Sequence, residues 1–503
     1  MKQYCMYELE FTAAPPEGSE IFVDLDAIFF IDGENCKEHV KGFYAGNGIY
    51  KVRFLPRKPG RYFWSVTGVV DLSGSDICAP AGKGHHGIVN AVGTHFEYED
   101  GTNFIPVGTT IYALAHQDQE LIDITFKTLQ VSPFNKVRHC LFPKHYDYNN
   151  NDPEFFPFEK DTKGKWDVNR PCYAFWEHFE SVIFRLAKLN IQTDLILFHS
   201  YDCWGFSEMS MEENRSYLEY VLRRFAAIPD LWWSMANEFD LVFARDMEDW
   251  YAIEKFIAEN DPYHHLLSNH NCFAFYDFTR PAITHCCIQT TQVESAAKFL
   301  KEYGKPVVYD ECCYEGNLPK AWGNISGFEM ANRFWIACVQ GAYATHGETF
   351  LSDDDILWWS RGGRLKGESR DRIAWLRTIL EELPGPLLPW EASHEPGLHE
   401  EEYEKLARRF GMLMMSMPES QQESALVKEG EFRGHCGDDV FIQYLARHCV
   451  GRMDWELPLH KDYRVEIIDM WEMTRKTVYA RVNGQMTIRL PGKEGIAVLA
   501  TAV

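Results

Sequence analysis

Short segments in which apolar and polar residues alternate run from Met1 to about Ala91. They include IFVDLDAIFFI, GIYKVRFLP and GRYFWSVTGVV, and turns rich in Gly, Pro and Asn-Gly separate them at intervals of roughly ten residues. This spacing is typical of an antiparallel β-sandwich. The following segment, PAGKGHHGIVNAVG, is rich in Gly and small residues, and it predicts a linker that ends near Gly93.

Beyond this linker, short apolar runs alternate with amphipathic stretches, which is the pattern of repeated βα units. Stretches such as CYAFWEHFESVIFRLAKLN and EDWYAIEKFIAEN repeat apolar residues every three or four positions, as helices do. The predicted strands are Phe104–Gly108, Lys136–Phe142, Thr193–Phe198, Leu231–Met235, Leu266–Ser268, Thr284–Ile288, Val307–Tyr309 and Gly341–Thr345. This order predicts a closed (β/α)8 barrel.

The proline-rich segment LPGPLLPW interrupts this pattern and is expected to end the barrel. From about Glu400 to Val503 the chain returns to short strands, with FIQYLAR, YRVEIIDMW, KTVYARV, QMTIRL and GIAVLAT. The predicted fold class is therefore α/β, a (β/α)8 TIM barrel flanked by N-terminal and C-terminal β-sandwich domains. We place the domains at residues 1–91, 92–395 and 396–503.

Charge and cysteine usage limit which binding partners and which cellular compartment we expect. The 50 basic and 74 acidic residues give a net charge of −24, which disfavours nucleic acid and anionic membranes as partners. The N-terminal segment lacks the apolar core of a secretory signal, and no apolar run is long enough to span a membrane. None of the 14 cysteines forms a C-x-x-C pair, so we expect reduced thiols and a cytoplasmic protein.

Two glutamates follow predicted barrel strands directly. Asn237 and Glu238 come after Leu231–Met235, and Glu311 comes two residues after Val307–Tyr309. Because active sites of such barrels lie at the carboxyl ends of the strands, the two carboxylates are expected to face each other across the barrel mouth. Glycoside hydrolysis requires such a pair, one carboxyl protonated and the other ionised. Either glutamate taken alone could equally be a surface residue or a helix cap.

An Asn-Glu pair after strand four and a second Glu after strand seven resemble the pattern of clan A glycoside hydrolases. The segments GFYAGNGIYKVRFLPRKPGRYFWSV, WSMANEFD, YDECCYEGN and THGETF with LWWSRGG resemble more closely the apiosidase-like and related glycoside hydrolases, which carry β-domains on both sides of the barrel. The resemblance implies a retaining enzyme in which Asn237 holds the sugar 2-hydroxyl, Glu238 is the acid/base and Glu311 is the nucleophile. It implies an oligosaccharide or small glycoside as the substrate, and no metal or organic cofactor.

Further residues near strand ends are candidates for substrate binding. Arg138 lies within the second strand, where its charge would keep Glu311 ionised, although a structural ion pair explains it equally well. The others are His145, His199, His270, His346, Glu348, Trp204 and Trp359. Each of these has an ordinary structural explanation beside the functional one, such as a histidine packed under a loop. Gln289 is the nearest polar candidate after strand six, where many clan A enzymes place a tyrosine that contacts the nucleophile.

Two other functions remain open at this point. The first is a metal-dependent hydrolase on the same barrel, suggested by the 19 histidines but lacking a cluster with clean ligand spacing. The second is a non-catalytic carbohydrate-binding protein. The outer β-domains could wall the pocket, mediate a homo-oligomer or bind glycan, and structural support is our first choice. The sugar and its linkage depend on loop geometry and do not follow from the sequence.

Overall fold

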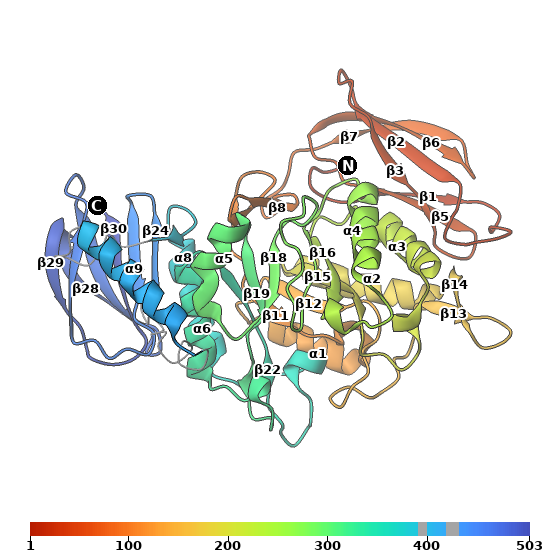
Figure 1. The fold of residues 1–503 in the computed structure, drawn as a ribbon. Coiled ribbons are helices and arrows are strands. Elements are labelled where there is room, and N and C mark those ends of the chain that lie inside the picture. The colour runs from red at the N-terminus through yellow and green to blue at the C-terminus, as the bar shows by residue number, and fades with distance from the viewer. Residues whose placement is uncertain (391–399, 419–431) are drawn as a thin grey trace. The chain divides into compact units, whose positions relative to one another are not determined.

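The computed structural model describes residues 1–390, 400–418 and 432–503 (Figure 1). The chain forms two compact units. The first comprises Met1–Met330 and Ala342–Arg377, and the second comprises Ala331–Gly341 and Thr378–Val503. The predicted domain boundary at residue 91 falls inside the first unit, and the boundary at residue 395 lies outside the described residues.

Two antiparallel sheets open the first unit, in the orders β1-β5-β4 and β3-β2-β6-β7. Buried and exposed positions alternate along β2, as expected for a sheet with one face in the core. Phe29 of β2 stacks on Phe54 of β5 with ring centroids 4.0 Å apart, so the two sheets pack together as a sandwich. The strands are β1 (Tyr7–Thr12), β2 (Leu25–Ile31), β3 (Glu38–Lys41), β4 (Phe43–Tyr44), β5 (Ile49–Phe54), β6 (Gly60–Gly68) and β7 (Leu72–Cys78).

The segment predicted as a linker is not only a linker, because its last residues form strand β8 (Val89–Val92). This strand belongs to a small antiparallel sheet with β9 (His95–Tyr98) and β10 (Asn103–Phe104). Phe96 of this sheet is fully buried, and its ring lies 5.1 Å from that of Trp232 and 5.4 Å from that of Tyr343. Both partners lie at the amino-terminal ends of barrel strands. The small sheet therefore closes the bottom of the barrel with apolar side chains.

Eight parallel strands form the barrel sheet, in the order β17-β16-β15-β12-β11-β21-β19-β18. They are β11 (Gly108–Thr110), β12 (Lys136–Cys140), β15 (Gln192–His199), β16 (Leu231–Asn237), β17 (Leu267–Ser268), β18 (Cys286–Gln289), β19 (Val307–Glu311) and β21 (Tyr343–His346). The segments at the two ends of the sheet also meet, because the Thr284 N–H donates to the Leu267 carbonyl at 2.9 Å. The predicted TIM barrel is confirmed. The first strand was predicted at Phe104–Gly108 and lies instead at Gly108–Thr110, because Phe104 pairs with Phe96 in the small sheet.

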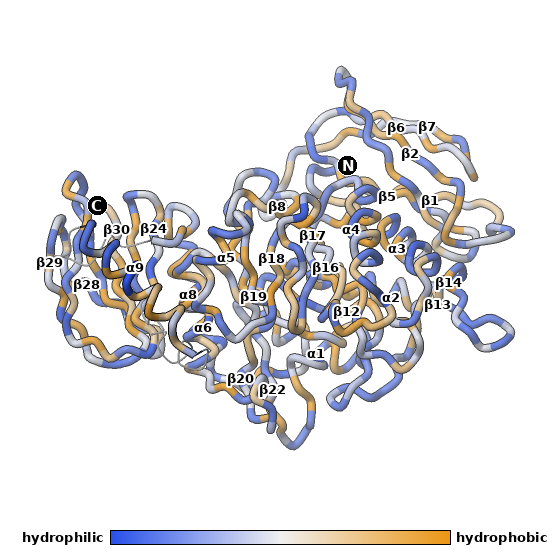
Figure 2. Tube along the Cα trace, in the orientation of Figure 1, coloured by the Kyte–Doolittle hydropathy of each residue, from blue (hydrophilic) through white to orange (hydrophobic). Residues whose placement is uncertain are grey.

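Amphipathic helices cover the barrel strands, and apolar residues colour much of the trace of β18 and β19 orange in Figure 2. In α2 the apolar residues at three- and four-residue spacing are the buried ones, which confirms the helical pattern in the sequence. A Ser210–Glu213 capping box begins α3. The helices are α1 (Gln119–Leu129), α2 (Tyr173–Lys188), α3 (Met211–Phe225), α4 (Met247–Asn260), α5 (Ala296–Tyr303), α6 (Gly327–Val339), α7 (Trp358–Arg361) and α8 (Ser369–Glu381). Four short strands lie in the loops: β13 (Phe158–Lys160), β14 (Trp166–Pro171), β20 (Glu315–Gly316) and β22 (Glu348–Thr349).

A buried ionic cluster fills the barrel interior. The Lys136 ammonium lies 2.6 Å from a carboxylate oxygen of Asp194 and 2.6 Å from one of Asp310. Asp310 also accepts hydrogen bonds from the Thr345 hydroxyl at 2.7 Å and the Cys287 thiol at 2.9 Å. The first two interactions join three different strands, β12, β15 and β19, across the barrel axis.

The second unit is built around a β-sandwich. A six-stranded antiparallel sheet, β23-β24-β25-β30-β27-β28, shares its core with the two-stranded antiparallel sheet of β26 and β29, where Trp455 and Ile488 pack with Val465 and Val498. Residues Glu400–Ser416, which we expected to begin the strands, form helix α9 instead. The strands are β23 (Leu388–Pro389), β24 (Phe432–Cys436), β25 (Val440–Tyr444), β26 (Arg452–Leu457), β27 (Tyr463–Asp469), β28 (Thr474–Val482), β29 (Gly484–Arg489) and β30 (Ile496–Ala502). Across the parts of the chain that are described, no helix combines the length and the apolar character needed to cross a bilayer.

Candidate active site

A pocket of about 420 Å³ opens at the carboxyl ends of the barrel strands. Its wall combines carboxylates, amides and lysines with a large number of aromatic rings. The lining residues are Tyr112, Lys144, Tyr146, Asp147, Tyr148, Tyr201, Asn237, Glu238, Gln289, Glu311, Tyr314, Lys320, Trp322 and Trp359. Both glutamates singled out in the sequence are among them.

Glu238 occupies a strained backbone position. It follows β16 with φ 55° and ψ 61°, a left-handed conformation that a residue with a side chain rarely adopts. Such a conformation costs on the order of 1–3 kcal/mol and persists only where neighbours enforce it. Here the Glu238 N–H donates to His270 Nδ1 at 3.3 Å, and the Phe239 N–H donates to the His270 carbonyl at 2.8 Å. His270 thus helps to hold the turn that directs Glu238 into the pocket.

Three donors hold the Glu238 carboxylate. The Tyr201 hydroxyl and the Asn237 amide, the latter at 3.1 Å, donate to Oε2. The Gln289 amide donates to Oε1 at 3.3 Å. Gln289 is therefore the strand-six contact, but it serves Glu238 rather than the carboxylate on strand seven.

Glu311 is the last residue of β19, and its Oε1 atom receives a different set of contacts. The Tyr112 hydroxyl donates to it, the Arg138 guanidinium lies 3.4 Å away, and His270 Nε2 lies 3.8 Å away. Burial, reinforced by the Arg138 charge, lowers the pKa of His270 far below its usual value, so the imidazole is neutral. The fully buried Arg138 is then the permanent positive charge beside Glu311.

Arg138 and Asn237 connect the two carboxylates. The Arg138 group that contacts Glu311 also donates to the Asn237 carbonyl oxygen at 3.3 Å, while the Asn237 amide donates to Glu238. Burial and the nearby Glu238 carboxylate raise the pKa of Glu311, and Arg138 acts in the opposite direction. The hydrogen bond from the Tyr112 hydroxyl also lowers the pKa of Glu311, so Arg138 and Tyr112 together limit this rise.

Aromatic rings form one wall of the pocket. The Trp359 ring centroid lies 5.1 Å from that of Trp322, 5.4 Å from that of Tyr146 and 5.5 Å from that of Tyr314. These edge-to-face and tilted contacts keep the rings rigid. An aromatic wall beside polar groups suits a sugar, which has apolar C–H faces and hydroxyl edges.

Lys144 brings a second buried cation to the pocket. Its side chain is almost fully buried, and its ammonium lies 3.4 Å from the centroid of the Tyr112 ring and 4.1 Å from that of Tyr201. Within the described part of the chain, no carboxylate forms an ion pair with it. Burial lowers the pKa of Lys144. The ammonium is available to oxygen atoms of a bound molecule.

The pocket brings together some of the predicted substrate-binding residues and leaves others out. Asn237 and Trp359 line it, and Arg138 and His270 lie directly behind the two glutamates. His199 is buried and contacts the Phe142 carbonyl, and His346 and Glu348 lie next to each other in a separate buried cluster. Trp204 donates to Asp152 at 2.9 Å and packs against the ring of His145 at 5.8 Å, and neither residue lines the pocket.

Sequence reasoning missed several residues of the pocket wall, namely Tyr112, Lys144, Asp147, Tyr148, Tyr314, Lys320 and Trp322. Tyr112 was missed because the first strand was predicted too early in the chain, and Tyr112 follows its true end. Lys144 lies four residues past β12 and Tyr314 lies three residues past β19. Their position shortly after a strand was the signal that could have identified them.

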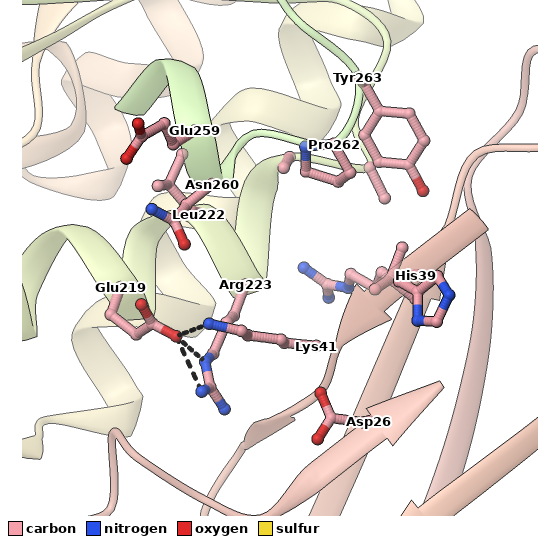
Figure 3. Close-up of a pocket in the computed structure, with 14 residues that line it drawn as sticks. Asp26, His39, Lys41, Glu219, Leu222, Arg223, Glu259, Asn260, Pro262 and Tyr263 are labelled. Carbon is pink, nitrogen blue, oxygen red and sulfur yellow. Dashed lines mark hydrogen bonds and ion pairs between the residues drawn. The ribbon is translucent and has the colours of Figure 1, made fainter. Parts of the chain in front are cut away.

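A second cavity, of about 220 Å³, lies between the N-terminal sandwich and helices α3 and α4 (Figure 3). Three of its charged side chains are paired with one another. Glu219 accepts from Lys41 at 2.9 Å and from Arg223 at 2.8 Å, which the dashed lines of Figure 3 mark. Unlike the pocket at the barrel mouth, this cavity presents no pair of carboxylates held for chemistry.

Family models match three stretches of the chain. Residues 91–397 match the model described as apiosidase-like, catalytic domain. Residues 1–68 and 431–501 match two domains of unknown function, DUF5060 and DUF5605. None of the curated proteins compared with the chain matches it.

Solved structures also resemble the chain. A candidate glycoside hydrolase from Bacteroides vulgatus is 33% identical, with a TM-score of 0.87, and the match covers 100% of this chain and 99% of that one. A glycoside hydrolase family 5 protein from Bacteroides vulgatus is 13% identical, with a TM-score of 0.59 and coverage of 83% and 94%. A further glycoside hydrolase is 12% identical, with a TM-score of 0.58 and coverage of 83% and 97%. The two more distant structures show the fold alone.

Proposed function

The chain belongs to the apiosidase-like family of glycoside hydrolases, and we propose that it removes a terminal sugar from oligosaccharides or small glycosides with retention of configuration. In this proposal Glu238 is the general acid/base and Glu311 is the nucleophile. One observation carries it: two glutamates at the ends of β16 and β19 line a single pocket and are linked through Asn237 and Arg138.

The reaction runs in two displacements. In the first, a Glu311 oxygen forms a bond to the anomeric carbon while the glycosidic C–O bond breaks and Glu238 gives its proton to the departing oxygen. In the second, Glu238 takes a proton from a water molecule, and the water oxygen displaces Glu311 from the anomeric carbon. The released sugar has the anomeric configuration of the substrate.

The contacts around each carboxyl group suit these roles. Arg138 and the Tyr112 hydroxyl both act at the same Glu311 oxygen and favour its ionised, attacking form. In this proposal Glu238 supplies the proton, and hydrogen bonds from Tyr201 and Gln289 fix the orientation of its carboxyl group. The negative charge of Glu311 disappears when it bonds to carbon, which lets Glu238 act next as a base.

The remaining pocket residues are assigned to the sugar. Asn237 is placed to bond the hydroxyl next to the anomeric carbon, as the family resemblance implies. The rings of Trp322 and Trp359 offer apolar surface to a sugar face, and Lys144 offers an ammonium to sugar oxygens. Recognition of one sugar by a pocket rather than by an open groove favours exo action.

The test is hydrolysis of a panel of aryl glycosides followed by proton NMR of the sugar at early times. We expect one glycoside of the panel to be cleaved. The first sugar signal should be that of the anomer with the same configuration as the substrate. Appearance of the opposite anomer would contradict the double displacement. Full activity is also expected after dialysis against a chelator, provided that circular dichroism shows the protein still folded. Loss of activity in a folded, metal-free protein would favour the metal-dependent hydrolase instead.

Replacing Glu238 with glutamine is expected to lower kcat/KM by about 10²- to 10⁴-fold on glycosides with a poor leaving group, because the departing oxygen then lacks a proton donor in the first displacement. Substrates whose leaving group has a low pKa need less protonation, and their kcat/KM should be affected much less. Measuring kcat/KM across aryl leaving groups of different pKa checks this. An equal loss for all leaving groups would contradict the acid role.

Replacing Tyr112 with phenylalanine should shift the acid limb of the pH profile upward. Its hydrogen bond lowers the pKa of Glu311, so removing it raises that pKa and requires a higher pH to ionise the nucleophile. A hydrogen bond to a charged group contributes about 1.5–3 kcal/mol, which corresponds to a loss in kcat/KM of about tenfold to a hundredfold at neutral pH. Profiles of kcat/KM against pH for both proteins measure the shift, and an unchanged acid limb would show that Tyr112 is only structural.

A further inference from the structure

Three buried side chains with metal-binding atoms meet where the segments after barrel strands β19 and β21 lie together. They are Glu315 of β20, His346 at the end of β21 and Glu348 of β22, and one ligand atom of each lies within 4.8 Å of the other two. Their exposed fractions are 2%, 0% and 1%. None of the three lines the pocket at the barrel mouth, so this cluster is separate from the candidate catalytic site.

Two atoms of the cluster lack a hydrogen-bond partner. His346 Nε2 and Glu348 Oε1 are both fully buried, and they lie 3.5 Å apart without making a hydrogen bond to each other or to another group. Buried polar atoms nearly always have a partner, because leaving one unsatisfied costs about 1–3 kcal/mol. The two atoms point to a missing ligand that both of them can bind.

No basic side chain offsets the negative charge of the cluster. In the portions of the chain that are described, neither Glu315 nor Glu348 forms an ion pair with a lysine or arginine. The nearest lysine in sequence, Lys366, directs its ammonium to Asp354 at 2.7 Å. Burying two carboxylates without a cation is costly even when hydrogen bonds hold them, so the cluster favours a bound positive ion.

Surrounding groups fix the two carboxylates in place. Glu315 accepts hydrogen bonds from the Glu368 N–H at 2.7 Å, the Ser369 N–H at 3.1 Å and the Ser369 hydroxyl at 2.5 Å. Glu348 Oε2 accepts from the Lys366 N–H at 2.7 Å, which leaves Oε1 turned toward the cluster. Carboxylates held in this way by outer hydrogen bonds are typical of metal ligands.

The imidazole is oriented in the same manner. His346 Nδ1 lies 3.1 Å from the Thr109 hydroxyl oxygen, which also accepts from Trp358 Nε1 at 2.8 Å. When Nδ1 donates its proton to Thr109, the lone pair of Nε2 faces Glu348. A ligating histidine almost always donates its other ring N–H to such an outer partner.

We propose that Glu315, His346 and Glu348 bind one structural divalent cation. One imidazole nitrogen and two carboxylates favour an ion that takes mixed nitrogen and oxygen ligands, such as Zn²⁺ or Mn²⁺, over Ca²⁺ or Mg²⁺. The ion joins the loops after β19 and β21 and neutralises their carboxylates. It is enclosed by protein and takes no part in the reaction proposed above, so the two proposals stand independently.

The experiment is dialysis of the full chain against a chelator, followed by equilibration with ZnCl₂ or MnCl₂ and measurement of bound metal by mass spectrometry. We expect one tightly bound ion per chain and a higher midpoint of thermal unfolding with Zn²⁺ or Mn²⁺ than with MgCl₂. H346Q and E348Q should each weaken binding by at least about tenfold. H460Q removes an exposed histidine in the second unit, and its binding should equal that of the wild type.

Two results overturn the inference. The first is that the metal-free wild-type protein takes up no more zinc or manganese than the buffer control. The second is that H346Q and E348Q bind as much tightly held metal as H460Q, because the ion then lies elsewhere. If E348Q fails to fold, E348D replaces it, since this variant keeps the charge and withdraws the carboxylate by one methylene. Wild-type uptake and the unfolding midpoint decide the matter even without a variant.

Discussion

The E311Q variant is expected to lose about 10⁴-fold or more in kcat on every glycoside that the wild-type protein cleaves. The amide keeps the shape of the side chain but cannot form the covalent bond to the anomeric carbon. The first displacement therefore lacks its nucleophile, whatever the leaving group. Steady-state rates on the best aryl glycoside from the panel measure the effect. The control is E294Q, which changes an exposed glutamate between β18 and α5 and should keep wild-type rates.

A small external nucleophile sharpens this test. In E311A, azide can enter the space left by the carboxylate and attack the sugar from that side, which gives a glycosyl azide of opposite configuration. In E238A the glycosyl-enzyme still forms on activated substrates, and azide attacks it from the other side, which gives a product of retained configuration. Exchange of these two outcomes would reverse the roles assigned to the glutamates. Residual activity above about a tenth of wild type in E311Q would place the nucleophile elsewhere.

Replacing Lys136 with methionine is expected to lower the free energy of unfolding of the barrel by about 3–5 kcal/mol. The change leaves Asp194 and Asp310 buried without their shared cation. Burial acts to lower the pKa of Lys136, but the two carboxylates raise it above its usual value. Without the lysine, burial would raise the pKa values of Asp194 and Asp310. Urea unfolding followed by tryptophan fluorescence measures the loss. K255M, which changes a lysine with a 72% exposed side chain, should stay within about 0.5 kcal/mol of wild type.

The same variant predicts a pH dependence with a definite sign. In K136M the aspartate pKa values rise in the folded state above their unfolded values, so the folded protein prefers the protonated forms. The destabilisation is therefore largest above the folded pKa values and decreases as the pH falls toward the unfolded ones. Exchanging one carboxylate for an amide as well, in K136M/D310N, should restore part of the lost stability. A loss that is the same at pH 5 and pH 8 would contradict this electrostatic origin.

Much of the architecture followed from local patterns. The runs at Leu231–Met235 and Val307–Tyr309 are almost entirely apolar, as expected for strands that helices cover on one side and the barrel core on the other. The position of Glu238 and Glu311 at strand ends followed from those runs. The first strand was misplaced because FIPVG is equally apolar, yet its Phe104 packs under the barrel in the small sheet with Phe96. Periodicity alone does not distinguish these two uses of an apolar run.

In the candidate site, too, some residues could be predicted from the sequence and others could not. Asn237 and Trp359 were identified because they lie near strand ends, whereas His199 was selected by the same criterion and is instead buried against the Phe142 carbonyl. Tyr112 was not selected at all, although its hydroxyl contacts Glu311 directly. A residue's position after a strand limits where its backbone lies. It does not determine whether the side chain points into the pocket or into the packing around it.

By itself the sequence determined the alternation of strands and helices in the barrel, the β-domains before and after it in the chain, and the positions of the two glutamates, because each of these depends on periodicity and on neighbours along the chain. Only the tertiary structure decided which groups surround those glutamates. Arg138 and Glu311 come from different strands, as do Gln289 and Glu238, and closing the barrel is what brings them within hydrogen-bond distance. The strength of a contact depends on a few tenths of an ångström and on burial, and both are set by the packing of segments far apart in the chain.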